Sequence, residues 1–197
     1  MYTVIGGLAS RAFRVLWLLE ELGLDYTHLK VGPRSDAVVA HNPSGKIPVL
    51  LDGDVAVTDS VAIMTYLADK HGALTAPAGT LDRARQDAMT QRIVDEIDGP
   101  LWLAARHSFV LPEEQRVPEV KPSAKWEFAR AEAALARDMC ESPFLMGDAI
   151  TVPDLLLTHC LGWALVAKFG VTEPVLSAYL DRMRDRDAYK LSREKAA

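Results

Sequence analysis

Residues 47–60 read IPVLLDGDVAVTDS, and this stretch holds two predicted strands, the turn between them and the start of a helix. Residues 47–51 and 55–57 are mostly apolar, and the Asp-Gly-Asp sequence between them is a tight-turn signal. We therefore expect an antiparallel hairpin. Apolar residues at helical spacing then predict a helix over residues 60–70.

Pro48 stands where the chain enters the first of these strands. A trans proline there removes a ladder donor, whereas a cis peptide turns the chain sharply and leaves the amide and carbonyl of Ile47 facing outward. After the hairpin, the chain comes back to the same end of the sheet at Asp59 and Ser60, where the helix starts. A carboxylate, a hydroxyl and unpaired N–H groups would therefore lie beside that free backbone edge. An amino-acid-like or peptide ligand fits such a site.

The residues before the hairpin alternate strand and helix patterns. Residues 2–5 are typical of a strand, residues 11–22 of a helix that Gly23 ends, and residues 26–31 of a second strand. A strand, helix and strand of these lengths imply a parallel pair with a right-handed crossover. The predicted order is βαβ, a poorly defined connection, and then ββα.

The chain changes character after the hairpin and its helix, because residues 82–190 show only helical periodicity. We predict a mixed α/β domain over residues 1–74, a linker over 75–81 and an all-helical bundle domain over 82–197. The expected helices of this bundle begin near residue 82, with a kink or break at Gly99-Pro100, and then cover residues 123–140, 152–168 and 174–185.

The helix predicted over residues 152–168 has the clearest start. Thr151 is a suitable N-cap, and Asp154 three residues later completes a variant of the capping box. The segment is apolar almost all round, so it should be the buried central helix of the bundle.

Composition excludes several classes of protein. The 197 residues are 49% hydrophobic and 25% charged, which suits an ordinary soluble protein with an ample core. A net charge of −5, with scattered basic residues, argues against nucleic-acid binding. No apolar run reaches the roughly 20 residues that span a bilayer, and we expect no export leader. Cys140 and Cys160 lack metal-ligand spacing, so we expect no metal and a reduced, cytoplasmic protein.

Ser10 lies between the first strand and the first helix, where its hydroxyl and the positive end of the helix point into the same space. A serine there can donate a hydrogen bond to a thiolate, and the helix dipole adds about 0.3–1 kcal/mol, which lowers the pKa of a thiol. Serine is also among the commonest N-cap residues. The two roles compete for one hydroxyl.

Four motifs occur along the chain in a characteristic order: SRAFRVLWLLEELG at 10–23, NPSGKIPVL at 42–50, DSVAI at 59–63 and GDAITVPD at 147–154. In sequence and spacing they closely resemble the bacterial cytosolic glutathione S-transferases, and the resemblance covers nearly the whole chain. It implies a thioredoxin-like first domain that binds glutathione, an all-helical second domain that supplies the pocket for the electrophile, and a homodimer.

The resemblance also assigns roles in the first domain. Ser10 is similar to the activating hydroxyl of the serine-type classes, which are theta-, delta- or zeta-like. Ile47, before a cis Pro48, would pair its backbone with the cysteinyl part of glutathione. Asp59 and Ser60 resemble the pair that holds the γ-glutamyl end, although Asp59 is equally suited to a helix N-cap.

Two more residues are candidates for glutathione contact. Lys46 could reach the glycyl carboxylate and His41 could assist, although both residue types are also common on solvated surfaces. In the second domain, Trp102, Arg106 and Phe109 follow the predicted break and could line the electrophile pocket. Aromatic residues at such spacing are also typical of a core.

The function that these residues indicate is the conjugation of glutathione to small hydrophobic electrophiles, with Ser10 activating the thiol. A glutathione-dependent isomerase or dehalogenase is an alternative, since the same first domain serves different pockets. Arg11 disfavours the isomerase class, in which a cysteine typically follows the serine. A non-catalytic binding or stress-response protein with the same fold is a third reading.

Overall fold

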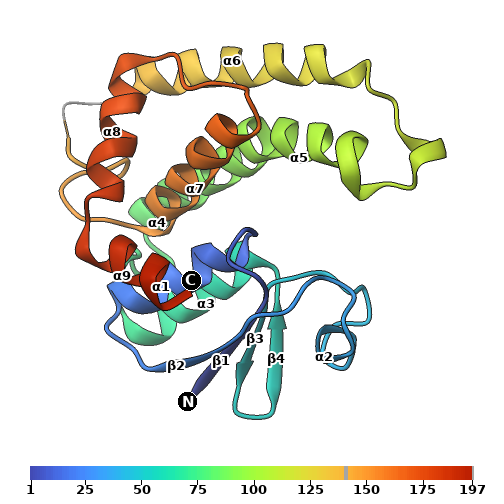
Figure 1. Ribbon diagram of the computed structural model, residues 1–197. Helices are drawn as coiled ribbons and strands as arrows, with labels where there is room; N and C mark the ends of the chain where they lie inside the picture. Colours follow the sequence, from blue (N-terminus) through green and yellow to red (C-terminus); the bar gives the residue numbers. More distant parts are fainter. Residues whose placement is uncertain (140–141, 197) are drawn as a thin grey trace. The chain divides into compact units, whose positions relative to one another are not determined.

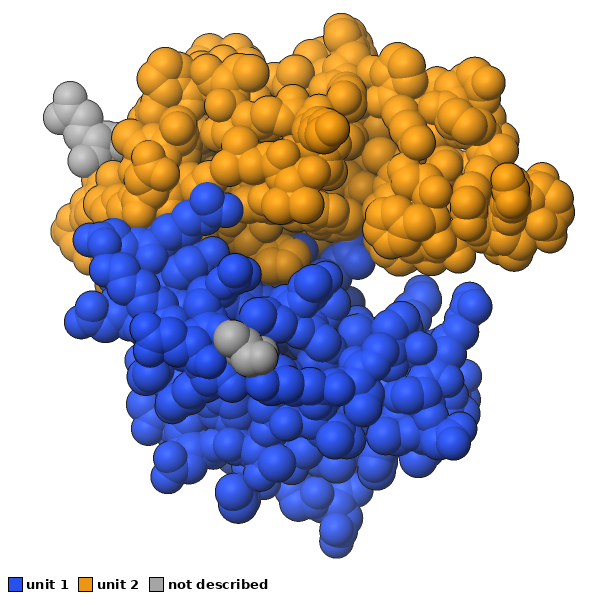
Figure 2. All heavy atoms as spheres, in the orientation of Figure 1, with its two compact units in different colours: residues 1–78, 183–197 blue, residues 79–182 orange. Residues whose placement is uncertain are grey.

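A computed structural model describes residues 1–139 and 142–196, so Cys140 lies outside the described residues (Figure 1). The chain divides into two compact units (Figure 2). Unit 1 comprises Met1–Ala78 with Met183–Ala197, and unit 2 comprises Gly79–Arg182. The sequence predicts that the residues after 182 belong to the helical domain, whereas in the structure residues 183–196 belong to unit 1.

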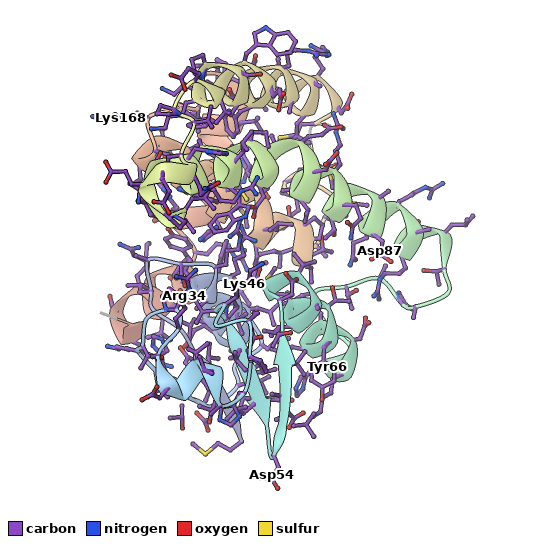
Figure 3. All side chains as sticks on the ribbon, turned by 90° about the vertical axis from the view of Figure 1, so that its right-hand side faces the viewer. Arg34, Lys46, Asp54, Tyr66, Asp87 and Lys168 are labelled. Atoms are coloured by element: carbon purple, nitrogen blue, oxygen red, sulfur yellow. The ribbon has the colours of Figure 1, made fainter. Side chains whose placement is uncertain are left out.

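Unit 1 is built on a four-stranded mixed sheet in the order β2-β1-β3-β4. Strand β1 pairs in parallel with β2, and β3 runs antiparallel to both β1 and β4. Figure 3 labels Asp54 at the tip of the β3–β4 hairpin, beside Gly53 with φ of 59°. The predicted fold class is confirmed. The strands are β1 Tyr2–Ile5, β2 Tyr26–Leu29, β3 Val49–Asp52 and β4 Val55–Thr58.

Three helices cover the sheet. Helix α1 (Ala12–Glu21) and helix α3 (Ser60–His71) pack against each other, and they contact β1 and β4 respectively. The connection that the sequence left undefined contains the short helix α2 (Asp36–Val39). Its Val38 is fully buried in a small apolar cluster with Ile5 and Val49. This cluster fixes the segment that leads to Pro48.

The C-terminal helix α9 (Asp187–Ala196) packs on α1 within unit 1. The Tyr189 ring meets the rings of Phe13 and Trp17 edge-on, with centroids 5.2 and 5.0 Å apart. The Arg186 guanidinium, just before α9, donates to both carboxylate oxygens of Glu21 at 2.7 Å. These contacts hold α1, and therefore the loop before it, against the end of the chain.

Unit 2 is helical, and its most buried helix is the one that the sequence predicted. Helix α7 is buried along most of its length and packs against α4 and α5. No helix within the described residues is long and apolar enough to cross a membrane. The α-helices of this part of the chain are α4 Leu81–Arg92, α5 Gly99–Ala105, α6 Val120–Asp138, α7 Val152–Val166 and α8 Pro174–Arg184.

The helix does not break at Gly99-Pro100. A π-helical stretch, Ile93–Asp98, precedes the pair, and the Gly99 N–H donates to the carbonyl of Val94 five residues back. Proline lacks an N–H and its ring crowds the carbonyl of the preceding turn. The wider π turn accommodates this ring while the chain stays helical.

Asp154 is buried at the start of α7, and its carboxylate accepts hydrogen bonds from three other segments. Its Oδ2 accepts the Thr151 N–H at 2.8 Å and the Thr151 hydroxyl at 2.9 Å, the reciprocal half of the predicted capping box. Its Oδ1 accepts the Leu145 N–H at 2.8 Å and the Tyr179 hydroxyl at 2.6 Å. Burial raises the pKa of Asp154, although these four donors act to lower it.

Candidate functional site

The loop that carries Ser10 lies against the segment that contains Ile47. The contact is made by Gly6, at the end of β1, which has φ of 146°. A Cβ on Gly6 would lie 2.9 Å from the Cβ of Ala12 and 3.2 Å from the Cβ of Ile47. Only glycine allows this close approach, which brings the loop before α1 beside the residue that precedes Pro48.

The Ser10 hydroxyl has the geometry of a helix cap. It donates to the Gly7 carbonyl at 2.6 Å and accepts the Ala12 N–H at 3.1 Å. Rotation about the Cβ–Oγ bond moves only the hydrogen, so Oγ can keep its bond from Ala12 while the hydrogen turns to another acceptor. A thiolate placed beside Ser10 would therefore compete with the Gly7 carbonyl for this hydrogen without loss of the bond from the Ala12 N–H.

The Ile47–Pro48 peptide bond is cis. Pro48 is buried and Ile47 is half-buried. In the part of the chain that the structure describes, no hydrogen bond involves the backbone N–H or carbonyl of Ile47. This backbone edge is therefore able to pair with an extended peptide.

The turn before Ile47 is organised by Asn42. Its side-chain amide donates to the Lys46 carbonyl at 2.9 Å, and its Oδ1 accepts the Ser44 N–H at 3.2 Å and the Ser44 hydroxyl at 2.8 Å. Gly45, with φ of 69°, also accepts the Arg34 N–H at 2.8 Å. The turn holds Lys46 next to the cis peptide with its side chain exposed.

Arg34 is a second exposed cation beside this turn, and no sequence motif selects it (Figure 3). A Cβ on Gly45 would lie 2.9 Å from Cγ of Arg34, so the two residues pack closely. Arg34 has φ of 64°, an uncommon conformation for a residue with a side chain. His41 is also exposed, and its role stays a prediction.

Asp59 is the N-cap of α3. Its Oδ1 accepts the N–H groups of Val61 and Ala62 at 2.8 and 3.1 Å. The residue has φ of 72°, which is rare outside glycine and found preferentially at functional sites. The cap uses one carboxylate oxygen, and Oδ2 contacts no donor among residues 1–139 and 142–196. Capping and ammonium binding are therefore compatible.

Ser60 occupies the first turn of α3 and is buried. Its Oγ accepts a hydrogen bond at 3.2 Å from the guanidinium of Arg14, a buried residue of α1. Its own N–H has no hydrogen-bond partner within the described residues. A buried cation, an unpaired N–H and the positive end of a helix together favour a carboxylate.

The two roles of Asp59 can be separated by substitution. Asp59→Asn keeps an oxygen acceptor for the cap and tolerates positive φ, so its thermal unfolding should match the wild type. The lost charge should weaken glutathione binding by about 10- to 100-fold, the value of a charge-assisted hydrogen bond. Calorimetric titration with glutathione measures this change. Wild-type affinity in the Asn variant would show that Asp59 only caps the helix.

The residues predicted for an electrophile pocket belong to unit 2. Trp102 is half-buried in α5, and Arg106 begins a second π-helical stretch, Arg106–Val110, that also contains Phe109. The Nε atom of Arg106 is buried and has no hydrogen-bond partner in the described chain, whereas Phe109 is 70% exposed. Their role as a pocket stays a prediction. No three metal-ligating side chains converge within the described residues.

Comparison with known proteins gives a consistent result. The family model of the glutathione S-transferase N-terminal domain matches residues 10–70. A glutathione S-transferase from Triticum aestivum is 28% identical over 186 residues, covering 92% of this chain and 84% of that protein. The glutathione S-transferase GstA of Escherichia coli O157:H7 is 27% identical over 178 residues and covers 85% of each chain.

A solved structure agrees over nearly the full length. The theta class glutathione S-transferase from Xanthomonas axonopodis pv. citri, determined with glutathione bound, has a TM-score of 0.75 and 28% identity, covering 97% of this chain and 96% of that one. Residues 10–70 thus match the glutathione S-transferase N-terminal domain, and nearly the whole chain is similar to glutathione S-transferases. The predicted family and enzyme class are confirmed, and the serine-type subclass stays a prediction.

Proposed function

We propose that the chain binds reduced glutathione in unit 1, stabilises its thiolate with Ser10 and conjugates it to small hydrophobic electrophiles. One observation carries this proposal. Unit 1 holds three groups together that could bind one ligand. The close packing at Gly6 brings the loop of Ser10 beside the unpaired backbone of Ile47. The hydrogen bond from Arg14 connects α1 to Ser60, whose N–H is unpaired within the described residues.

The groups match glutathione from end to end. Ser60 and the start of α3 would take the γ-glutamyl carboxylate, and the free oxygen of Asp59 would take the ammonium. The backbone of Ile47 would pair with the cysteinyl residue, as an added strand pairs with a sheet edge. Lys46 and Arg34 would attract the glycyl carboxylate. The Xanthomonas relative with bound glutathione supports glutathione as the ligand.

The chemistry requires a thiolate next to an electrophile. The Ser10 hydrogen would turn from the Gly7 carbonyl to the sulfur and stabilise its negative charge, while the thiol proton goes to solvent. The thiolate then forms a carbon–sulfur bond, either displacing a leaving group or adding to an activated double bond, whose carbanion then takes a proton from solvent. Binding both reactants at one site supplies the remaining acceleration.

Unit 2 would choose the electrophile. Trp102 and Phe109 would provide apolar surface, and Arg106 would favour polarised or acidic substrates. We further propose a cytoplasmic homodimer that uses no metal, in accord with the family resemblance.

Retention on immobilised glutathione, followed by a conjugation assay, tests the proposal. We expect elution by free glutathione and formation of thioether products with aryl halides or activated alkenes. Retention without any turnover would contradict the catalytic part and favour a binding protein. Turnover that regenerates free glutathione, or releases halide without a stable thioether, would indicate an isomerase or a dehalogenase instead.

A further inference from the structure

His28, in the edge strand β2, hydrogen-bonds through Nε2 to the carbonyl oxygen of Gly6 at 2.7 Å. A carbonyl oxygen can only accept, so Nε2 carries the proton and donates it. The other ring nitrogen, Nδ1, is buried and has no hydrogen-bond partner in the described part of the chain. The bond to Gly6 is therefore the one hydrogen bond of this imidazole within the described residues.

The Gly6 peptide is held from several directions. Its N–H donates to the Leu29 carbonyl at 3.0 Å, and Ala12 and Ile47 approach it so closely that no side chain fits there. Because a peptide unit is planar, the bond from His28 to the Gly6 carbonyl fixes the plane that leads into Gly7. This restraint limits the directions in which the next carbonyl, that of Gly7, can point.

The Gly7 carbonyl accepts the Ser10 hydroxyl at 2.6 Å. Two consecutive glycines give the loop wide conformational freedom, so a restraint on this pair controls where the hydroxyl lies. We propose that His28 is a positioning residue for the thiol-activation step: its bond to Gly6 holds the Gly6–Gly7 loop so that the Ser10 hydroxyl faces the glutathione sulfur. This inference rests on the proposed function of Ser10.

Three variants test the inference. His28→Leu removes the donor, His28→Gln offers a side-chain N–H in its place, and Thr27→Val changes the exposed neighbour on the same strand as a control. We expect His28→Leu to lower kcat on the order of tenfold and to raise the pKa of the bound glutathione thiol, with KM for glutathione within about twofold of wild type. His28→Gln should recover most of kcat, and Thr27→Val should match the wild type.

A His28→Leu variant with wild-type kcat and bound-thiol pKa would overturn the inference, and so would equal losses in the Leu and Gln variants. Amide hydrogen exchange of residues 6–12, measured without glutathione, is independent of turnover. We expect faster exchange in His28→Leu and wild-type exchange in His28→Gln, and unchanged exchange in both would overturn the inference. A wild-type enzyme without turnover would contradict the proposed function, while the exchange result would still decide whether His28 restrains the loop.

Discussion

We expect Ser10→Ala to lower kcat/KM for conjugation by about 10- to 100-fold, because a hydrogen bond to a charged group is worth about 1.5–3 kcal/mol. The Ala variant also loses the acceptor that caps α1 through the Ala12 N–H, which should reduce stability by about 0.5–2 kcal/mol. Steady-state kinetics and thermal unfolding of the same preparation measure the two effects separately.

Two further variants at Ser10 separate capping from activation. Ser10→Thr keeps a hydroxyl and should retain much of the activity. Ser10→Asp keeps an acceptor for the Ala12 N–H but brings a negative charge and no donor to the sulfur, so it should be stable and inactive. An active Asp variant would contradict the assigned role of the hydroxyl.

We expect Asp154→Ala to destabilise the protein by about 3–5 kcal/mol, because each buried donor that loses its acceptor costs about 1–3 kcal/mol. Total stability is typically only about 5–15 kcal/mol, so this is a large loss. The change leaves the Leu145 N–H and the Tyr179 hydroxyl without their acceptor and removes the reciprocal bond of the capping box from Thr151. Urea unfolding followed by circular dichroism measures the loss, and poor soluble expression is the expected practical sign.

The control for this prediction is Asp148→Ala, an exposed acidic residue in the same segment, which should change stability by no more than about 0.5 kcal/mol. Asp154→Asn keeps the shape of the side chain, but its NH2 group would face N–H and hydroxyl donors in place of an acceptor oxygen. Its loss of stability should therefore fall between those of Asp148→Ala and Asp154→Ala. Equal stability of the Asp154 and Asp148 alanine variants would show that the buried carboxylate does not hold these segments together.

Features determined by neighbouring residues were predictable from the sequence. The β3–β4 hairpin follows from a tight turn between two apolar runs, and α7 follows from a cap and an apolar segment. These signals are complete within a few residues, so they need no knowledge of the rest of the chain. The parallel pairing of β1 and β2 follows from the length of the connection between them.

Features that depend on distant partners were not predictable. Helix α9 carries few apolar residues, and its packing depends on Tyr189 reaching the rings of Phe13 and Trp17 far away in sequence. The π turn before Pro100 depends on backbone spacing that residue types do not specify. Local patterns thus predict where helices and strands lie, while long-range contacts and backbone spacing determine how the helices pack and continue.

The candidate site shows the same division. The motif around Ser10 and the Asp59-Ser60 pair were visible in the sequence, but the sequence presented capping and ligand binding as competing roles. In the structure the capping bonds leave both residues able to bind a ligand, since Ser10 can turn its hydrogen alone and Asp59 caps with one oxygen. The positions of Arg34 and His28 required the folded backbone, because neither residue belongs to a recognisable motif.

The most direct test of the central claim is the pKa of the glutathione thiol in the bound complex, followed through the ultraviolet absorbance of the thiolate as pH is raised. In the wild type this pKa should lie below that of free glutathione, and Ser10→Ala should raise it by about 1–2 units. The same bound-thiol pKa in both proteins, at saturating glutathione, would contradict the claim that Ser10 stabilises the thiolate.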